Sequence, residues 1–136
     1  MGTVFGVVFQ IHSILGEMIL PVAIVAVAIY LLVTYRPNAP RGPVARLFPV
    51  LVDIQVGLGI IYWVFLLFNT SGAAQARYLS FPFILHPLIG ILAAGLAHMA
   101  IGARNPLRGL GRWAPLVSLG VLLVLVISNV MIGVQT

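Results

Sequence analysis

The chain has 136 residues, of which 62% are hydrophobic and only 7% are charged. With a mean hydropathy of +1.18 it has too little polar surface to cover a soluble globule of its size. The net charge of +5 comes from seven arginines against two acids, Glu17 and Asp53, which excludes the dense basic surface that nucleic-acid binding requires. The absence of cysteine excludes disulfides, thiolate metal sites and covalent haem attachment.

Four stretches are long and apolar enough to cross a bilayer, which takes about 20 residues per helix. The predicted spans cover residues 4–33, 48–68, 81–103 and 114–134. The N-terminus has neither a basic region nor a small-residue cleavage pattern, so we expect the first span to remain in the mature protein. The sequence therefore predicts one all-α domain over residues 1–136, a multi-pass integral membrane protein in contact with the lipid bilayer.

Six of the seven arginines fall in the first and third predicted loops, 35–47 and 104–113, and Arg77 stands alone in the second. By the positive-inside rule the first and third loops are cytoplasmic, and both termini are external. Short loops favour an up-down-up-down four-helix bundle, in which the first and third spans are diagonal and both run inward.

Five prolines lie in or beside the predicted spans. Pro49, Pro82 and Pro115 are placed in first turns, where a missing amide donor costs nothing. Pro21 and Pro87 lie inside spans, where each frees a carbonyl one turn earlier and predicts a kink.

All three histidines lie inside predicted spans, where an ionisable residue indicates a functional site. His12 in the first span and His86 in the third each sit about two turns or less below the external face. They can therefore face each other across the bundle at one depth, and two neutral imidazoles are a standard way to hold haem b. The alternative is that these histidines only bond neighbouring helices or waters.

Each histidine is followed four residues later by a glycine: Gly16 after His12, Gly90 after His86 and Gly102 after His98. Helical side chains lean toward the N-terminus, so a glycine at this spacing leaves room over the imidazole for a flat group such as a porphyrin. Close backbone packing between membrane helices is the alternative reason for these glycines.

His98 lies about 18 Å along the helix from His86 and about 120° around it, so it cannot complete a second bis-histidine site. One haem per chain is the expected limit. Asp53 in the second span lies near the depth of His98, and adjacent antiparallel helices can pair the two. Such a couple could bind a quinone head group or transfer its proton. The alternative is that the pair only offsets the free-energy cost of placing the Asp53 carboxylate in the membrane.

Glu17 lies near the middle of the first span beside Pro21, about 140° around the helix from His12. A proton relay, a bond into the kinked backbone or a contact with a partner subunit would each explain it. Arg77 and Tyr78 in the external loop are placed to meet haem propionates, and Asn129 to orient an imidazole.

A histidine early in the first helix and another at matching depth in the third resemble the four-helix membrane cytochrome b modules, including a half-bundle of haem A synthase. The resemblance covers all four spans and rests on His12 and His86 with their glycines. It implies haem b ligation by these two residues. The chain lacks the Glu-x-x-x-His arrangement and the external cysteine pair of the synthases, and it has one bundle where they have two.

These patterns favour a haem b electron-transfer protein or a redox subunit of a respiratory or photosynthetic complex, one that interacts with a quinol or with other membrane redox subunits. An energy-transducing membrane, such as the inner membrane of a bacterium, is its expected location. The alternative is a cofactor-free accessory subunit that stabilises a larger membrane complex. A small channel using Glu17, Asp53 and His98 is a third reading, which the sparse charge and the lack of paired broken helices disfavour.

Overall fold

A computed structural model describes residues 2–136, and this part of the chain is helical apart from short connections. The first span is one long rod in three parts: α1 (Gly2–Ile14), a π-helical turn η1 (Leu15–Ile19) and α2 (Leu20–Thr34). The second is α3 (Pro43–Asn69). A short helix α4 (Gly72–Tyr78) precedes α5 (Phe81–Ala100), and a 3-10 segment η2 (Arg108–Trp113) leads into α6 (Ala114–Gln135).

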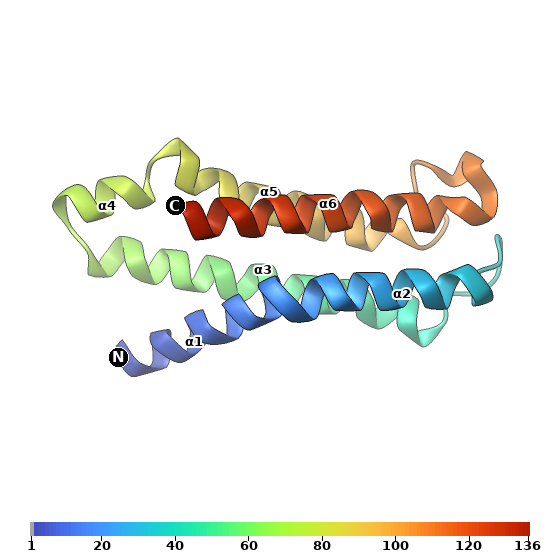
Figure 1. Cartoon of the computed structure of the whole chain (residues 1–136), viewed down its shortest axis with the longest axis horizontal. Coiled ribbons are helices and arrows are strands. Elements are labelled where there is room, and N and C mark those ends of the chain that lie inside the picture. Colours follow the sequence, from blue (N-terminus) through green and yellow to red (C-terminus); the bar gives the residue numbers. More distant parts are fainter. Residues whose placement is uncertain (1) are drawn as a thin grey trace.

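Four helical stretches are long and apolar enough to cross a membrane: Gly2–Thr34, Pro43–Asn69, Gly72–Ala100 and Arg108–Gln135. The predicted all-α class and number of spans are confirmed. Figure 1 shows both chain ends at the same end of the bundle, with the chain reversing at each connection. The α1–α2 rod packs mainly against α3 and α6, and α5 packs against the same two helices from the other side. The first and third spans therefore lie diagonally.

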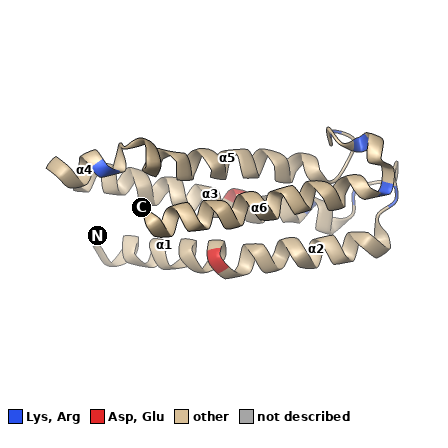
Figure 2. Ribbon diagram, turned by 45° about the horizontal axis from the view of Figure 1, so that its top comes forward, with Lys and Arg blue, Asp and Glu red and all other residues tan. Residues whose placement is uncertain are grey.

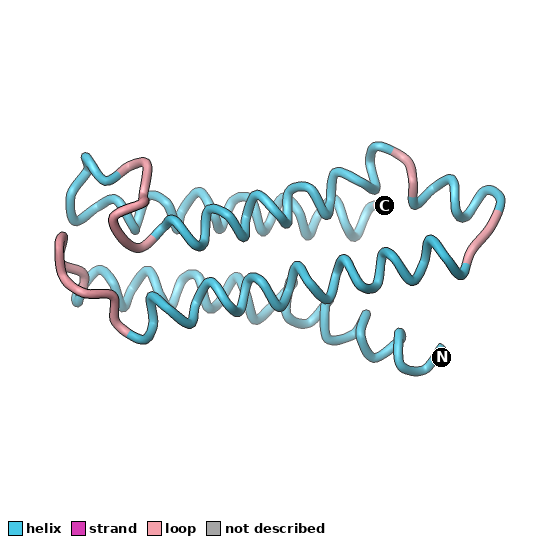
Figure 3. The backbone as a smooth tube through the Cα atoms, turned by 180° about the vertical axis from the view of Figure 1, so that it is seen from behind, coloured by secondary structure: helices cyan, strands magenta, loops and turns pink. Residues whose placement is uncertain are grey.

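The arginines lie at the ends of the bundle, and the two acidic residues lie within the helices (Figure 2). Loops one and three meet at the end far from the termini, where the guanidinium of Arg41 fills the position that a side chain at Gly102 would take. Figure 3 shows the same grouping of connections at the two ends. By the positive-inside rule this arginine-rich end is predicted to be cytoplasmic.

That orientation can be tested by cysteine accessibility, because the chain has no native cysteine. We expect Ala74→Cys in α4 to react with a membrane-impermeant maleimide in intact cells. Helix α4 lies at the end of the bundle that holds the termini, and the Ala74 side chain is exposed there. We expect Ala39→Cys in the first loop to react only after permeabilisation. The reverse pattern would invert the topology and move the site described below to the other membrane face, without separating its residues.

Two predicted boundaries differ from the structure. α3 begins at Pro43, whose fixed φ suits a first helical position, so Pro49 lies inside the helix and its predicted place in a first turn is wrong. α5 ends at Ala100 and not at residue 103, because Ile101 is extended and Gly102 has a φ of 135°. Gly102 is therefore outside the helix, which removes the third of the predicted histidine–glycine spacings.

Pro21 perturbs the first span as predicted. With no amide hydrogen it cannot bond the carbonyl of Glu17, and the helix responds with the π-helical turn, closed by a bond from the Leu20 amide to the Leu15 carbonyl. Figure 1 shows α1 inclined away from the axis of α2 beyond this turn. Pro87 lies in α5 without interrupting its helical assignment.

The apolar core fills only the half of the bundle nearest the arginine-rich loops. Its members come from the inner parts of all four spans: Leu20, Ile24, Leu31, Ala45, Phe48, Val52, Ala93, Ala97, Ala100, Ile101, Leu119, Leu122 and Val126. The small side chains on α5 let its backbone approach α6 closely, as is usual where lipid supplies no hydrophobic drive. Among residues 2–136, the half of the bundle nearest the termini has no comparable apolar core and contains the cavity described below.

Asn105 closes the connection between α5 and α6. It is 2% exposed; its Nδ2 donates to the Ala100 carbonyl and the Ser118 hydroxyl oxygen, and its Oδ1 accepts from the Leu107 amide. We expect Asn105→Ala to leave these partners unsatisfied and to lower the free energy of unfolding by about 2 kcal/mol or more, measured as a lower apparent Tm in detergent. Asn69→Ala, at an exposed helix end, is the matched control and should change it by less than about 0.5 kcal/mol.

Candidate functional site

A cavity of about 540 Å³ lies in the half of the bundle nearest the termini, and all four spans line it. This volume is in the usual range for small-molecule and cofactor sites, about 300 to 1,000 Å³. The walls are mainly apolar, with aromatic side chains from Phe9, Tyr62, Trp63 and Phe83. Polar groups are few, which makes each of them informative about what the cavity accepts.

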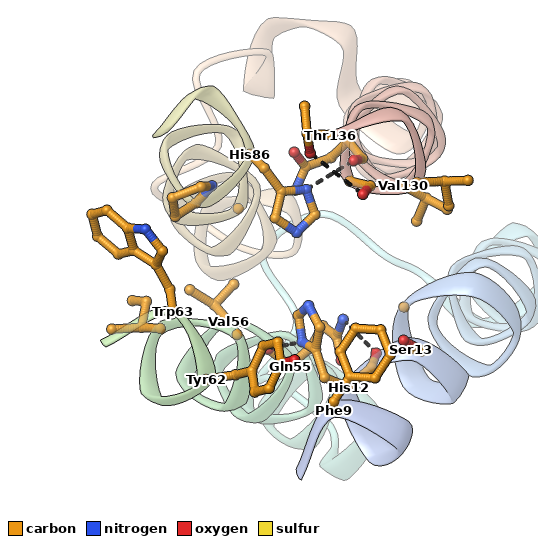
Figure 4. Close-up of a pocket in the computed structure, with 18 of the residues that line it drawn as sticks. Phe9, His12, Ser13, Gln55, Val56, Tyr62, Trp63, His86, Val130 and Thr136 are labelled. Carbon is orange, nitrogen blue, oxygen red and sulfur yellow. Dashed lines mark hydrogen bonds between the residues drawn. The ribbon is translucent and has the colours of Figure 1, made fainter. Parts of the chain in front are cut away.

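His12 from α1 and His86 from α5 project into this cavity from opposite sides (Figure 4). Their ring centroids are 6.0 Å apart and their planes are nearly perpendicular, at 87°. The predicted meeting of the two histidines at one depth is confirmed. The gap is too wide for a direct hydrogen bond between the rings and suits one atom placed between them.

Each imidazole is held by a backbone carbonyl of the neighbouring helix. His12 Nδ1 lies 3.0 Å from the Gln55 oxygen in α3, and His86 Nδ1 lies 2.9 Å from the Asn129 oxygen in α6. A carbonyl oxygen only accepts, so Nδ1 carries the proton and donates, which leaves Nε2 with a free lone pair. Figure 4 shows the second nitrogen of each ring pointing toward the space between the two rings.

The positions beside the two imidazoles are glycines of the neighbouring helices, not of their own. A Cβ at Gly59 in α3 would lie 2.6 Å from Cε1 of His12, and a Cβ at Gly133 in α6 would lie 2.8 Å from Cε1 of His86. Real Cβ atoms essentially never approach this closely, so any side chain at these positions would displace the ring. Each glycine comes one turn after the carbonyl that accepts from the same histidine.

Gly16 and Gly90 also line the cavity, and the nearest atoms to each belong to side chains of adjacent helices. A Cβ at Gly16 would lie 2.5 Å from Nε2 of Gln55, so this glycine admits the Gln55 amide. At Gly90 the nearest atoms belong to Val56 and Asn129, at ordinary contact distances of 3.5 and 3.7 Å.

Two amide side chains contribute buried oxygens to the site. Gln55 Nε2 donates to the His12 carbonyl at 2.9 Å, while Oε1 of Gln55 and Oδ1 of Asn129 are buried and have no hydrogen-bond partner among residues 2–136. Both residues line the cavity. A buried oxygen without a partner costs free energy, so this pair indicates that a ligand or water meets them when the cavity is filled.

The site is built twice from one pattern. Many cavity-lining residues of the first half have a cavity-lining counterpart 74 positions later, as His86 follows His12. Six such pairs are identical: Phe9/Phe83, His12/His86, Gly16/Gly90, Val52/Val126, Val56/Val130 and Gly59/Gly133. Gln55 and Asn129 are the corresponding amides. The two histidine–carbonyl bonds both join residues 43 positions apart. Two tandem helical hairpins thus present equivalent faces to the cavity.

Arg77 and Tyr78 line the cavity at the end of the bundle that holds the termini, beside Thr136. Arg77 is exposed, and Tyr78 accepts a bond from the indole of Trp63 through its carbonyl, at 3.0 Å. The Trp63 indole thus ties α3 to α4 beside the cavity. A guanidinium at this position is suited to a carboxylate of a bound molecule.

Asp53 and His98 form the predicted ion pair between α3 and α5. His98 Nε2 lies 2.9 and 3.0 Å from the two carboxylate oxygens, and about half of each side chain is exposed. The pair is separate from the cavity. Glu17, by contrast, lies in the π-helical turn, lines the cavity and also reaches the outer surface.

His12 and His86 bring two potential metal ligands into the cavity. Residues 2–136 hold no group of three or more histidine, cysteine, aspartate or glutamate side chains able to bind one. Two imidazoles occupy two positions of a six-coordinate metal, so the other four ligands would come from water or from a chelate. A porphyrin is such a chelate.

Comparisons of the chain with protein-family models, with curated proteins and with solved structures found no match. The resemblance to membrane cytochrome b modules therefore stays a hypothesis.

Proposed function

We propose that the protein binds one haem b between His12 and His86 and takes part in electron transfer within an energy-transducing membrane. The observation that carries the proposal is the 6.0 Å spacing of the two imidazole centroids. An imidazole nitrogen lies about 2.0 Å from a bound metal and about 1.1 Å from its ring centre, so two axial imidazoles on one ion have centroids about 6 Å apart.

The donor chemistry supports the same occupant. Each Nδ1–H is fixed on a backbone carbonyl, which selects the tautomer whose Nε2 binds iron and holds the ring in orientation. Equivalent residues from the two hairpins meet the two faces of the bound group, as suits a flat molecule with two similar faces. Arg77 supplies a cation at the mouth for the propionates.

The chain's own residues would set what the haem does. Haem iron supplies one-electron chemistry when bound, and two protein ligands leave it no open position for a substrate. The walls of the site are mainly apolar, and Gly59 and Gly133 leave the space that the two imidazoles occupy. These features favour electron transfer over catalysis. A quinol pool or a redox subunit would serve as donor, and an acceptor on the side of the termini as recipient.

One preparation tests the proposal. The protein, purified in detergent after expression with ample haem, should show a reduced-minus-oxidised b-type spectrum and one haem per chain. His98→Ala should leave this spectrum unchanged, because His98 lies three turns along α5 from His86 and outside the cavity. A colourless preparation would overturn the haem proposal and favour the cofactor-free accessory subunit.

A further inference from the structure

The Asp53–His98 pair departs from the two-fold pattern that the cavity-lining residues show. By the 74-residue repeat, Ile127 in α6 corresponds to Asp53, and Ile24 in α2 corresponds to His98. Helices α2 and α6 pack against each other, as α3 and α5 do. The corresponding positions are thus both isoleucine, and α2 packs against α6 without an ion pair at these positions. An ionisable couple inside a membrane is costly, so its presence at one of two equivalent contacts indicates a use beyond packing.

The space beside the pair breaks the pattern as well. Gly57 follows Asp53 by one turn of α3, and Gly95 precedes His98 by three residues in α5, so both glycines lie on the faces that carry the pair. A Cβ at either glycine would meet no atom within 4 Å. The equivalent positions hold Met131 and Pro21. The α3–α5 contact thus has both the ion pair and the two glycines, whereas the equivalent positions of the α2–α6 contact have neither.

The pair is accessible from the lipid. The side chain of His98 is 54% exposed and that of Asp53 is 47% exposed, both on helices that cross the membrane. His98 Nε2 faces the carboxylate, and its Nδ1 has no hydrogen bond within residues 2–136. Neutral His98 offers Nδ1 as an acceptor and protonated His98 offers it as a donor, while Asp53 accepts in either case.

We propose that Asp53 and His98, with the open space at Gly57 and Gly95, bind the head group of a lipid-soluble quinone or quinol. A quinol hydroxyl donates to the Asp53 carboxylate or to neutral His98 Nδ1, and a quinone carbonyl accepts from protonated His98. The flat ring lies over the two glycines and the tail remains in the bilayer. Delivery of electrons from this site to the cavity rests on the proposed function, whereas binding of the head group does not.

Calorimetric titration of the detergent-purified protein with decylubiquinone tests the site. We expect saturable binding of one molecule per chain, weakened at least tenfold in the double variant Asp53→Ile/His98→Ile, which copies the other contact and should therefore fold. Gly57→Met, which copies Met131, should weaken binding to a similar extent by filling the space. Gly120→Met is the matched control in α6, since it too has no atom within 4 Å, and should bind normally.

The titration is repeated on His12→Ala, so that loss of haem and loss of quinone binding are scored separately. Unchanged affinity in both the double variant and Gly57→Met would overturn the proposal. So would the absence of saturable binding by the unaltered chain, which would instead assign the pair to a contact with a helix of a partner subunit.

Discussion

Replacing either His12 or His86 by alanine is expected to abolish the haem spectrum, and to do so to the same degree. The two imidazoles are held in the same way, each by a carbonyl 43 positions away and each beside a glycine of the neighbouring helix. On the proposed function, loss of either imidazole would remove one of the two residues that hold the haem and would enlarge the cavity. We expect haem affinity to fall roughly 100-fold or more, beyond the usual cost of losing an orienting partner of a metal ligand.

The measurement is haem per chain and the reduced-minus-oxidised spectrum of each variant after identical purification. His98→Ala is the control, because it removes an imidazole from the same helix as His86 but outside the cavity. A haem spectrum that persists in both His12→Ala and His86→Ala would exclude ligation by these residues. A loss in only one of them would exclude the symmetric site and leave a single histidine ligand.

The sequence was sufficient for the fold because lipid imposes a simple rule on it. Four apolar stretches and the placement of arginine specify the number of spans and predict their direction, and neither depends on which face of a helix meets which neighbour. The same reasoning predicted that His12 and His86 share a depth. Depth follows from position along a helix, and the structure places the two rings together.

Helix rotation is what the sequence left undetermined. Gln55, Gly59 and Gly133 were missed because they act from neighbouring helices, and a uniformly apolar helix gives no moment that would orient its face. Asn129 was expected to orient an imidazole, and it contacts His86 through its backbone carbonyl. Room beside the imidazoles was therefore sought in the histidines' own helices, at Gly16 and Gly90, and found in the adjacent ones. The signal that would have found them is the 74-residue repeat, which aligns Gln55 with Asn129 and Gly59 with Gly133, as it aligns His12 with His86.

Boundaries failed for a more local reason. Residues 43–47 include Arg46 and were assigned to a loop, yet Pro43 begins α3 there, because an arginine at the end of a membrane helix can reach the interface. Pro49 consequently lies inside the helix. It is buried there, and helices that cross a membrane tolerate an internal proline where neighbouring helices pack against it.

The second large effect is expected from alanine at Gly59 or Gly133, two residues with no chemistry of their own. The new methyl group would need to occupy space 2.6 Å from the His12 ring or 2.8 Å from the His86 ring, so the imidazole must move and its Nδ1–H loses the carbonyl. The ring then has neither a fixed tautomer nor a fixed orientation. Orienting partners of metal ligands are typically worth 10- to 100-fold in affinity, so we expect a loss of roughly that size in haem affinity for each variant.

Gly120→Ala in α6 separates this effect from the general cost of adding a methyl group to a membrane helix, since no atom lies within 4 Å of its Cβ position. It should keep full haem content. Haem titration of the apoproteins, with helix content checked by circular dichroism, gives the three affinities on one scale. Normal haem affinity in both Gly59→Ala and Gly133→Ala would show that the two rings can shift without loss, and that the carbonyl bonds do not position them. A lower haem affinity in both variants, with Gly120→Ala unchanged, would show that haem binding depends on residues of α3 and α6 as well as on the histidines of α1 and α5.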